Sequence, residues 1–194
     1  MLVLLLATLA AAVSPDHPAA TSDSPKPEAI GNRELGIAIG FGVPTNDRLY
    51  VNPFGPTLSA RFGWTLGGPT FRYYVGAEGT LTTGVRRSYF TESATAKLFH
   101  AGVAVGLRYY LANQPVYVGI NLGAGLGRLT YQLGDRNDAD NVCLGWSSAV
   151  TLGFAITKQI VLGAEAKVTV ISWPGAHLDP LLAFTPSVQS TYHF

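Results

Sequence analysis

Apolar and polar residues alternate along the last segment of the chain, from Leu181 to Phe194. The apolar positions include Val188, Tyr192 and Phe194, and most of the positions between them are small or polar. A period of two residues is that of a β-strand with one apolar and one polar face. Pro186 falls on the apolar side and cannot donate a backbone hydrogen bond, so we expect it at an unpaired position.

The same alternation recurs upstream and predicts seven further strands. These cover residues 34–43, 57–66, 70–81, 96–111, 116–130, 142–157 and 160–172. Each approaches or exceeds the roughly 9 to 11 residues that a tilted strand needs to cross a bilayer. The connections alternate in length: 67–69, 112–115 and 158–159 are predicted tight turns, and 44–56, 82–95, 131–141 and 173–180 are predicted loops.

The alternation fits a soluble barrel of the lipocalin kind as well as a membrane barrel. Side-chain size favours the membrane, because Gly, Ala, Ser and Thr fit the narrow interior of an eight-stranded barrel more easily than Leu, Phe and Trp do. Composition agrees, since only 13% of the residues are charged and a soluble outer face would need more. The sequence therefore predicts an all-β fold, an eight-stranded antiparallel up-and-down transmembrane β-barrel.

Aromatic residues on the apolar faces gather toward the strand ends, as in the interfacial girdles of membrane barrels. The girdle predicted near the short turns contains Trp64, Phe71, Tyr73, Tyr109, Phe154, Tyr192 and Phe194, and the opposite girdle contains Phe41, Phe99 and Trp146.

Three segments are predicted along the chain. Residues 1–12 are apolar and end in small residues, which is typical of a secretory signal peptide, although no basic residue precedes the apolar core. Residues 13–33 are rich in Pro, Ser, Ala and Asp and read as a disordered periplasmic tether. Residues 34–194 form the outer-membrane β-barrel. The single Cys143 cannot form an internal disulfide and is interpreted as a small residue within a strand.

Charged residues also occur on the faces predicted to point into the barrel. They are Arg61, Arg72, Glu78, Arg108, Glu165 and Lys167. Charges inside a narrow lumen must pair or stay hydrated, so they form either a structural network or a constriction for a small solute. We expect Glu165 to pair with an arginine such as Arg61 or Arg108.

The sequence gives no convincing pattern for catalysis, a cofactor or a metal. The histidines after the tether are His100, His177 and His193, and none has a serine two residues away together with an acid placed to orient it. The acidic segment 135–140 lacks the glycine and the ligand spacing of a calcium loop and is predicted to be a solvated loop. The net charge of +1 gives no argument for nucleic acid.

Taken together, the signal, the eight strands, the loop asymmetry and the terminal Tyr192-His193-Phe194 resemble the small outer-membrane β-barrels typified by the OmpA transmembrane domain, OmpX, Ail and OmpW. The resemblance implies an assembly signal at Val188, Tyr192 and Phe194, read by the barrel-assembly machinery. It also implies contact with outer-membrane lipid and lipopolysaccharide. The expected role is structural or surface recognition through the loops, where Arg86, Arg87, Tyr89 and Phe90 could meet a surface ligand. A narrow pore and, less favoured, a lipid-A-modifying enzyme are the alternatives.

Overall fold

The computed structural model describes residues 33–44, 55–85, 94–111, 114–133, 136–173 and 180–194 of the chain. These residues form eight strands and no helix. The strands are β1 (Arg33–Pro44), β2 (Gly55–Gly67), β3 (Phe71–Val85), β4 (Ala94–Tyr110), β5 (Val116–Leu133), β6 (Arg136–Ala155), β7 (Ile160–Ser172) and β8 (Leu181–His193). Thus no described segment is a helix suited to crossing a membrane.

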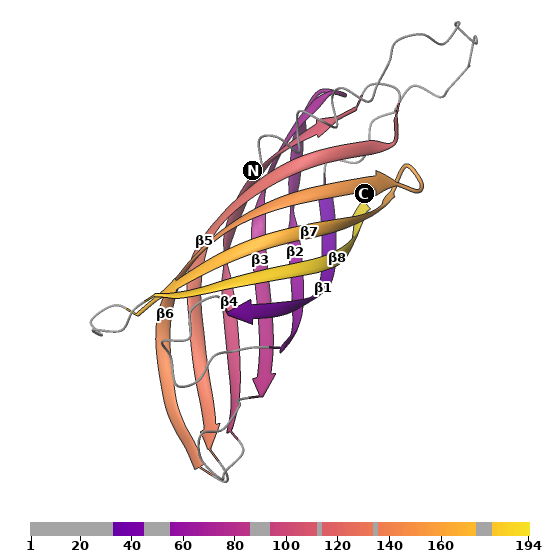
Figure 1. The fold of residues 1–194 in the computed structure, drawn as a ribbon. Helices are drawn as coiled ribbons and strands as arrows, with labels where there is room; N and C mark the ends of the chain where they lie inside the picture. The colour runs from indigo at the N-terminus through magenta and orange to yellow at the C-terminus, as the bar shows by residue number, and fades with distance from the viewer. Residues whose placement is uncertain (1–32, 45–54, 86–93, 112–113, 134–135, 174–179) are drawn as a thin grey trace, which may run out of the picture.

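Each strand pairs with its neighbours in the sequence, and β1 pairs with β8 to close the barrel. Every pairing is antiparallel, and the closing register runs from Glu34 opposite His193 to Pro44 opposite Ala183. The C-terminus lies at the same end of the barrel as the short turn between β6 and β7 (Figure 1). The predicted up-and-down barrel is confirmed.

The alternating pattern places the large apolar side chains outside. Ile39, Val103 and Val188, for example, are each 68% exposed on the outer surface. Most of the inward positions between them carry small or polar residues, many of them buried. An exposed apolar belt of this extent indicates a surface covered by lipid, because its exposure to water would be strongly unfavourable.

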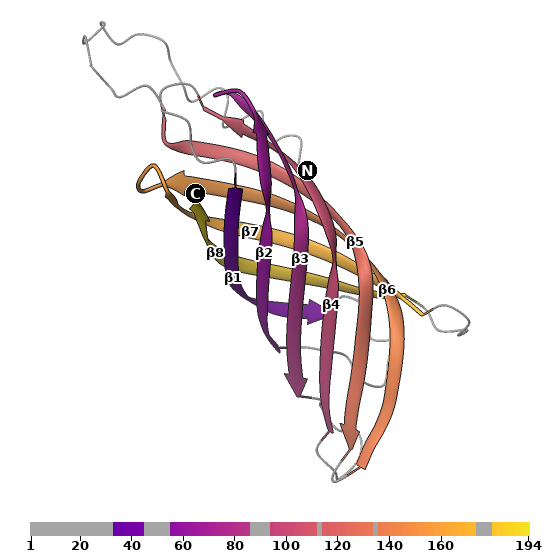
Figure 2. The same cartoon turned by 180° about the vertical axis from the view of Figure 1, so that it is seen from behind.

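Several strands are longer at the long-loop end than the sequence predicted. The predicted loop 131–141 is wrong for most of its length, because β5 continues to Leu133 and β6 already begins at Arg136. The solvated loop expected at the acidic segment is therefore corrected to strand over 136–140. Backbone pairing continues there although the sequence has no alternation of apolar and polar residues that would predict a strand. The β5–β6 hairpin consequently reaches beyond β1 and β8 (Figures 1 and 2).

Pro186 lies where β8 has an interrupted ladder. The register with β1 runs through Gly40 opposite Ser187 and resumes at Val43 opposite Phe184, so it omits a pair at Pro186. On its other side Pro186 is aligned with Ala166 of β7. Proline has no amide hydrogen, so this interruption is where a strand in a closed barrel can accept it.

Glycine is required where β4 approaches β5 closely. A Cβ on Gly102 would overlap the backbone oxygen of Ala124 and the Cα of Gly125. We expect Gly102→Val to destabilise the refolded barrel by about 1–3 kcal/mol, because the backbone cannot yield as a flexible side chain would. Urea unfolding in detergent measures the change. The matched Gly79→Val should cost clearly less, since a Cβ there meets only the His100 oxygen, at 4.0 Å; equal losses would contradict the explanation.

Candidate functional site

The lumen at the short-turn end is crossed by an ion pair between β1 and β4. The two terminal nitrogens of Arg108 donate to the two carboxylate oxygens of Glu34 at 2.5 and 2.6 Å. The side chain of Glu34 is fully buried and that of Arg108 is 1% exposed. A bidentate arginine–carboxylate pair is both strong and fixed in orientation. This pair therefore spans the interior of the barrel between β1 and β4 at its level.

Further charged residues continue the network up the lumen. The Nε of Arg61 lies 3.4 Å from a Glu34 oxygen, and its Nη1 donates to Glu165 at 3.5 Å. Lys167 lies 3.8 Å from Glu165 and also pairs closely with Glu78. The pairing of Glu165 is thus with Arg61, whereas Arg108 has a different partner.

All six charged residues assigned to the lumen from the sequence do point inward, but the sequence analysis missed Glu34, which holds Arg108. Its signal was present: Glu34 has the inward parity of β1, opposite the lumenal His193 of β8. In the sequence pattern Glu34 marks only the residue at which the alternation begins.

Arg72 differs from the other lumenal cations because it has no ion pair within the described residues. It is 8% exposed, its Nε has no hydrogen-bond partner, and its guanidinium lies 5.2 Å from the centre of the Tyr110 ring. Arg108 makes similar contacts with Tyr74 and Tyr117, at 5.5 and 5.2 Å. Aromatic rings can stabilise a desolvated guanidinium, but they do not neutralise it.

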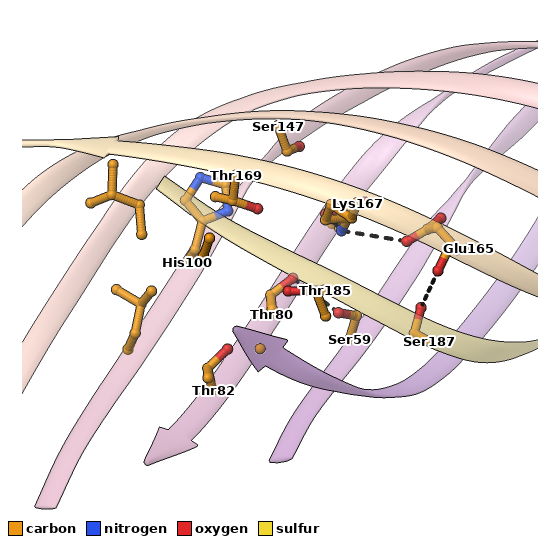
Figure 3. Close-up of a pocket in the computed structure, with 15 residues that line it drawn as sticks. Ser59, Thr80, Thr82, His100, Ser147, Glu165, Lys167, Thr169, Thr185 and Ser187 are labelled. Carbon is orange, nitrogen blue, oxygen red and sulfur yellow. Dashed lines mark hydrogen bonds and ion pairs between the residues drawn. The ribbon is translucent and has the colours of Figure 1, made fainter. Parts of the chain in front are cut away.

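A small chamber lies at the end of the ionic network that is away from the Glu34–Arg108 pair. It has a volume of about 30 Å³ and is lined by Glu78, Glu165, Lys167 and His100 together with serine and threonine hydroxyls, several of which are labelled in Figure 3. A volume of this size holds about two water molecules. Charged, imidazole and hydroxyl groups line a large part of it, so the chamber suits water or a very small solute.

An apolar cluster closes the lumen on the long-loop side of this chamber. Its members are buried inside the barrel: Leu98, Leu129, Cys143, Ile171, Trp173 and Leu181. Leu98 and Ile171 also line the chamber. The alternation does not predict this layer, because it indicates small and polar residues inside the barrel and places Trp173 in a loop. Cys143 does lie in a strand, but as a member of this cluster.

The aromatic residues predicted for the girdles all lie on the outer surface. The exposed fractions are between 42% and 60% for Trp64, Phe71, Tyr73, Tyr109, Phe154, Trp146, Tyr192 and Phe194. Several contact one another near the short turns, where the ring centres of Phe71 and Tyr109 are 5.0 Å apart and those of Tyr192 and Phe194 are 6.0 Å apart. Val188 shares the outer face of β8 with the last two.

Other predicted features fall outside the described residues. These are the signal peptide, nearly all of the tether, His177 and the loop residues Arg86, Arg87, Tyr89 and Phe90. Arg33, assigned to the tether, belongs to β1. Within the described part of the chain, no group of three or more acidic, histidine or cysteine side chains is placed to hold a metal ion.

Comparison with known proteins identifies the same architecture. The sequence matches the model for the outer membrane protein beta-barrel domain over residues 2–180. No curated protein sequence gives a significant match. Among solved structures, Neisserial surface protein A has a TM-score of 0.57 at 14% identity, over 84% of this chain and 96% of its own.

Two further solved structures are similar at low identity. The outer membrane enzyme PagL has a TM-score of 0.51 at 14% identity, over 83% of this chain and 99% of its own. Ail, the attachment invasion locus protein of Yersinia pestis, has a TM-score of 0.48 at 18% identity, over 84% of this chain and 96% of its own. The structural likeness to Neisserial surface protein A and to PagL, at 14% identity in each case, shows a shared fold and no more.

Proposed function

The chain belongs to the outer membrane protein beta-barrel domain family, and on that premise we propose a closed barrel with a structural or surface-recognition role through its extracellular loops. Its place is the outer membrane, with the apolar belt against lipid. The proposal adds lipopolysaccharide as a neighbour, export through the periplasm, and assembly through the barrel-assembly machinery. The short turns then face the periplasm and the longer loops face outward, as in barrels of this kind.

One observation carries the proposal: buried side chains fill the lumen at two levels. The Glu34–Arg108 pair and its neighbours fill it on one side of the chamber, and the apolar cluster fills it on the other. An ion crossing the barrel would have to displace a buried ion pair and then pass a dry layer, each of which is costly. A barrel closed in this way has its outer surface and its loops left for function.

A narrow pore is the second candidate, and the observation that favours it is the chamber, which is large enough for water. The chamber contains Glu78, Glu165 and Lys167, charges of the kind that select ions in wider pores. Opening it would require both closures to move.

We also propose that the barrel has no catalytic role. The Nε2 of His100 and both ring nitrogens of His193 have no hydrogen-bond partner. A catalytic histidine would be held by an acid and would reach a nucleophile. His193 comes within 4.0 Å of Glu34, but that carboxylate is held by Arg108.

Planar-bilayer recording of the refolded barrel tests the proposal. Folding is first established from the change in gel mobility on boiling. We expect no discrete current steps from the folded protein, and none from Glu165→Gln, because the apolar layer remains. Steps in the unaltered protein that change in size or selectivity in Glu165→Gln would instead establish the pore.

A further inference from the structure

The lumen carries one positive charge more than its carboxylates neutralise. Among the side chains that the structure describes, four cations point inward (Arg61, Arg72, Arg108 and Lys167) against three carboxylates (Glu34, Glu78 and Glu165). Ion pairs connect three of these cations to carboxylates. The unpaired charge therefore resides at Arg72.

Arg72 lies at the short-turn mouth of the barrel. It is the first inward residue of β3 after the turn, and it is aligned with Gly67 on one side and with Arg108 on the other. Gly67 adds no side chain, and a Cβ at Gly68 in the turn would meet nothing within 4 Å. Arg72 is therefore the lumenal cation at the short-turn end of β3, beside two glycine positions that add no side chain.

Other polar groups in the same layer also lack partners. The hydroxyls of Tyr110 and Tyr117 are buried without a hydrogen bond, and so is the Nε of Arg72. The two rings pack together with centres 5.1 Å apart, and Arg72 lies over Tyr110. Three buried donors without acceptors, beside an uncompensated cation, together cost several kcal/mol if left unmet.

We propose that this layer binds a small soluble oxyanion, a phosphate or carboxylate group, with Arg72 as its charged ligand and Tyr110 and Tyr117 as hydrogen-bond donors. Such a ligand supplies what the site lacks, which is one negative charge and several acceptor oxygens. The planar guanidinium suits an oxyanion better than a spherical halide, because two of its N–H groups can meet two oxygens. The site adjoins the Glu34–Arg108 pair, because Arg108 is aligned with Arg72 and lies over the Tyr117 ring, but Arg72 itself belongs to no ion pair among the described residues.

The test uses the refolded chain in dodecyl maltoside, without lipid, and inorganic phosphate as the probe. Phosphate is titrated at constant ionic strength against chloride, while the urea midpoint and the 31P line width are recorded. We expect a saturable rise in the midpoint. Arg72→Gln should weaken apparent phosphate affinity by about tenfold or more, since a charge-assisted hydrogen bond is lost. In phosphate-free buffer the same variant should be at least as stable as the unaltered protein, because a buried unpaired charge has been removed.

Lys158→Gln is the matched control. It removes the same charge at the same end of the barrel, from the exposed turn between β6 and β7, and should leave the phosphate dependence unchanged. Arg72→Lys keeps the positive charge but lacks the planar guanidinium with its paired N–H groups, so it should retain only part of the phosphate affinity.

Four outcomes would overturn the proposal. An absence of any saturable phosphate effect would mean that water meets these groups. An equal effect of chloride would indicate a halide site, and an equal loss in Lys158→Gln would indicate diffuse attraction. An Arg72-dependent stabilisation by phosphatidylglycerol in phosphate-free nanodiscs would identify a lipid headgroup as the ligand.

Discussion

Glu34→Gln is expected to destabilise the barrel by about 3–5 kcal/mol, the cost of leaving one partner of a buried ion pair without the other. Arg108 would keep its charge at 1% exposure, and its two bonds of 2.5 and 2.6 Å would lose their charged acceptor. Arg61 would lose its 3.4 Å contact at the same time. The free energy of unfolding in urea, followed by tryptophan fluorescence in detergent or lipid, measures the effect.

Two variants separate this explanation from a general loss of packing. Glu34→Gln combined with Arg108→Gln removes both charges and should recover a substantial part of the loss. Glu165→Gln should cost less than Glu34→Gln, because Arg61 keeps Glu34 and Lys167 keeps Glu78. A double variant no more stable than Glu34→Gln would show that the charge itself is not what matters. If Glu34→Gln does not refold, refolding of the double variant still decides the question.

The strand pattern was predictable because lipid and lumen impose opposite demands on alternate residues. β7 was predicted at Ile160–Ser172, the range that the structure has. A short turn fixes its start, and its apolar and polar residues alternate strictly. The same logic failed at the far ends of β5 and β6, where pairing extends past the apolar belt into a stretch of sequence that is rich in polar residues. Backbone hydrogen bonds carry that extension, and they leave no trace in side-chain hydrophobicity.

The interior was harder to predict than the exterior. Parity identified which charges face inward, but not which pairs form, because partners such as Glu34 and Arg108 lie three strands apart around the barrel. The apolar layer was missed for a related reason. Leu98, Leu129 and Ile171 follow the inward parity, yet an apolar residue on an otherwise polar face reads as an exception until a closed barrel brings several together.

The outer face offers the other large effect, because lipid contact is a depth-dependent constraint. Val105 is 48% exposed on β4, between the outward rings of Phe99 and Tyr109, and its neighbours in the register are Val75 and Leu122. Val105→Arg would put a charge near the midplane of the apolar belt. We expect a loss of about 2–4 kcal/mol in the free energy of unfolding in phospholipid vesicles.

Leu66→Arg is the control for depth. Leu66 is 59% exposed at the end of β2 beside Tyr73, where an arginine can reach the interface and the cost should fall to about 0–1 kcal/mol. The difference between the two losses in free energy measures how the cost of an arginine depends on depth in the bilayer, since both variants add the same side chain to the same kind of surface. Equal losses at the two positions would mean that the apolar belt is not centred in lipid at Val105. No loss at either would contradict a lipid-facing exterior, and with it the orientation of every strand in the barrel.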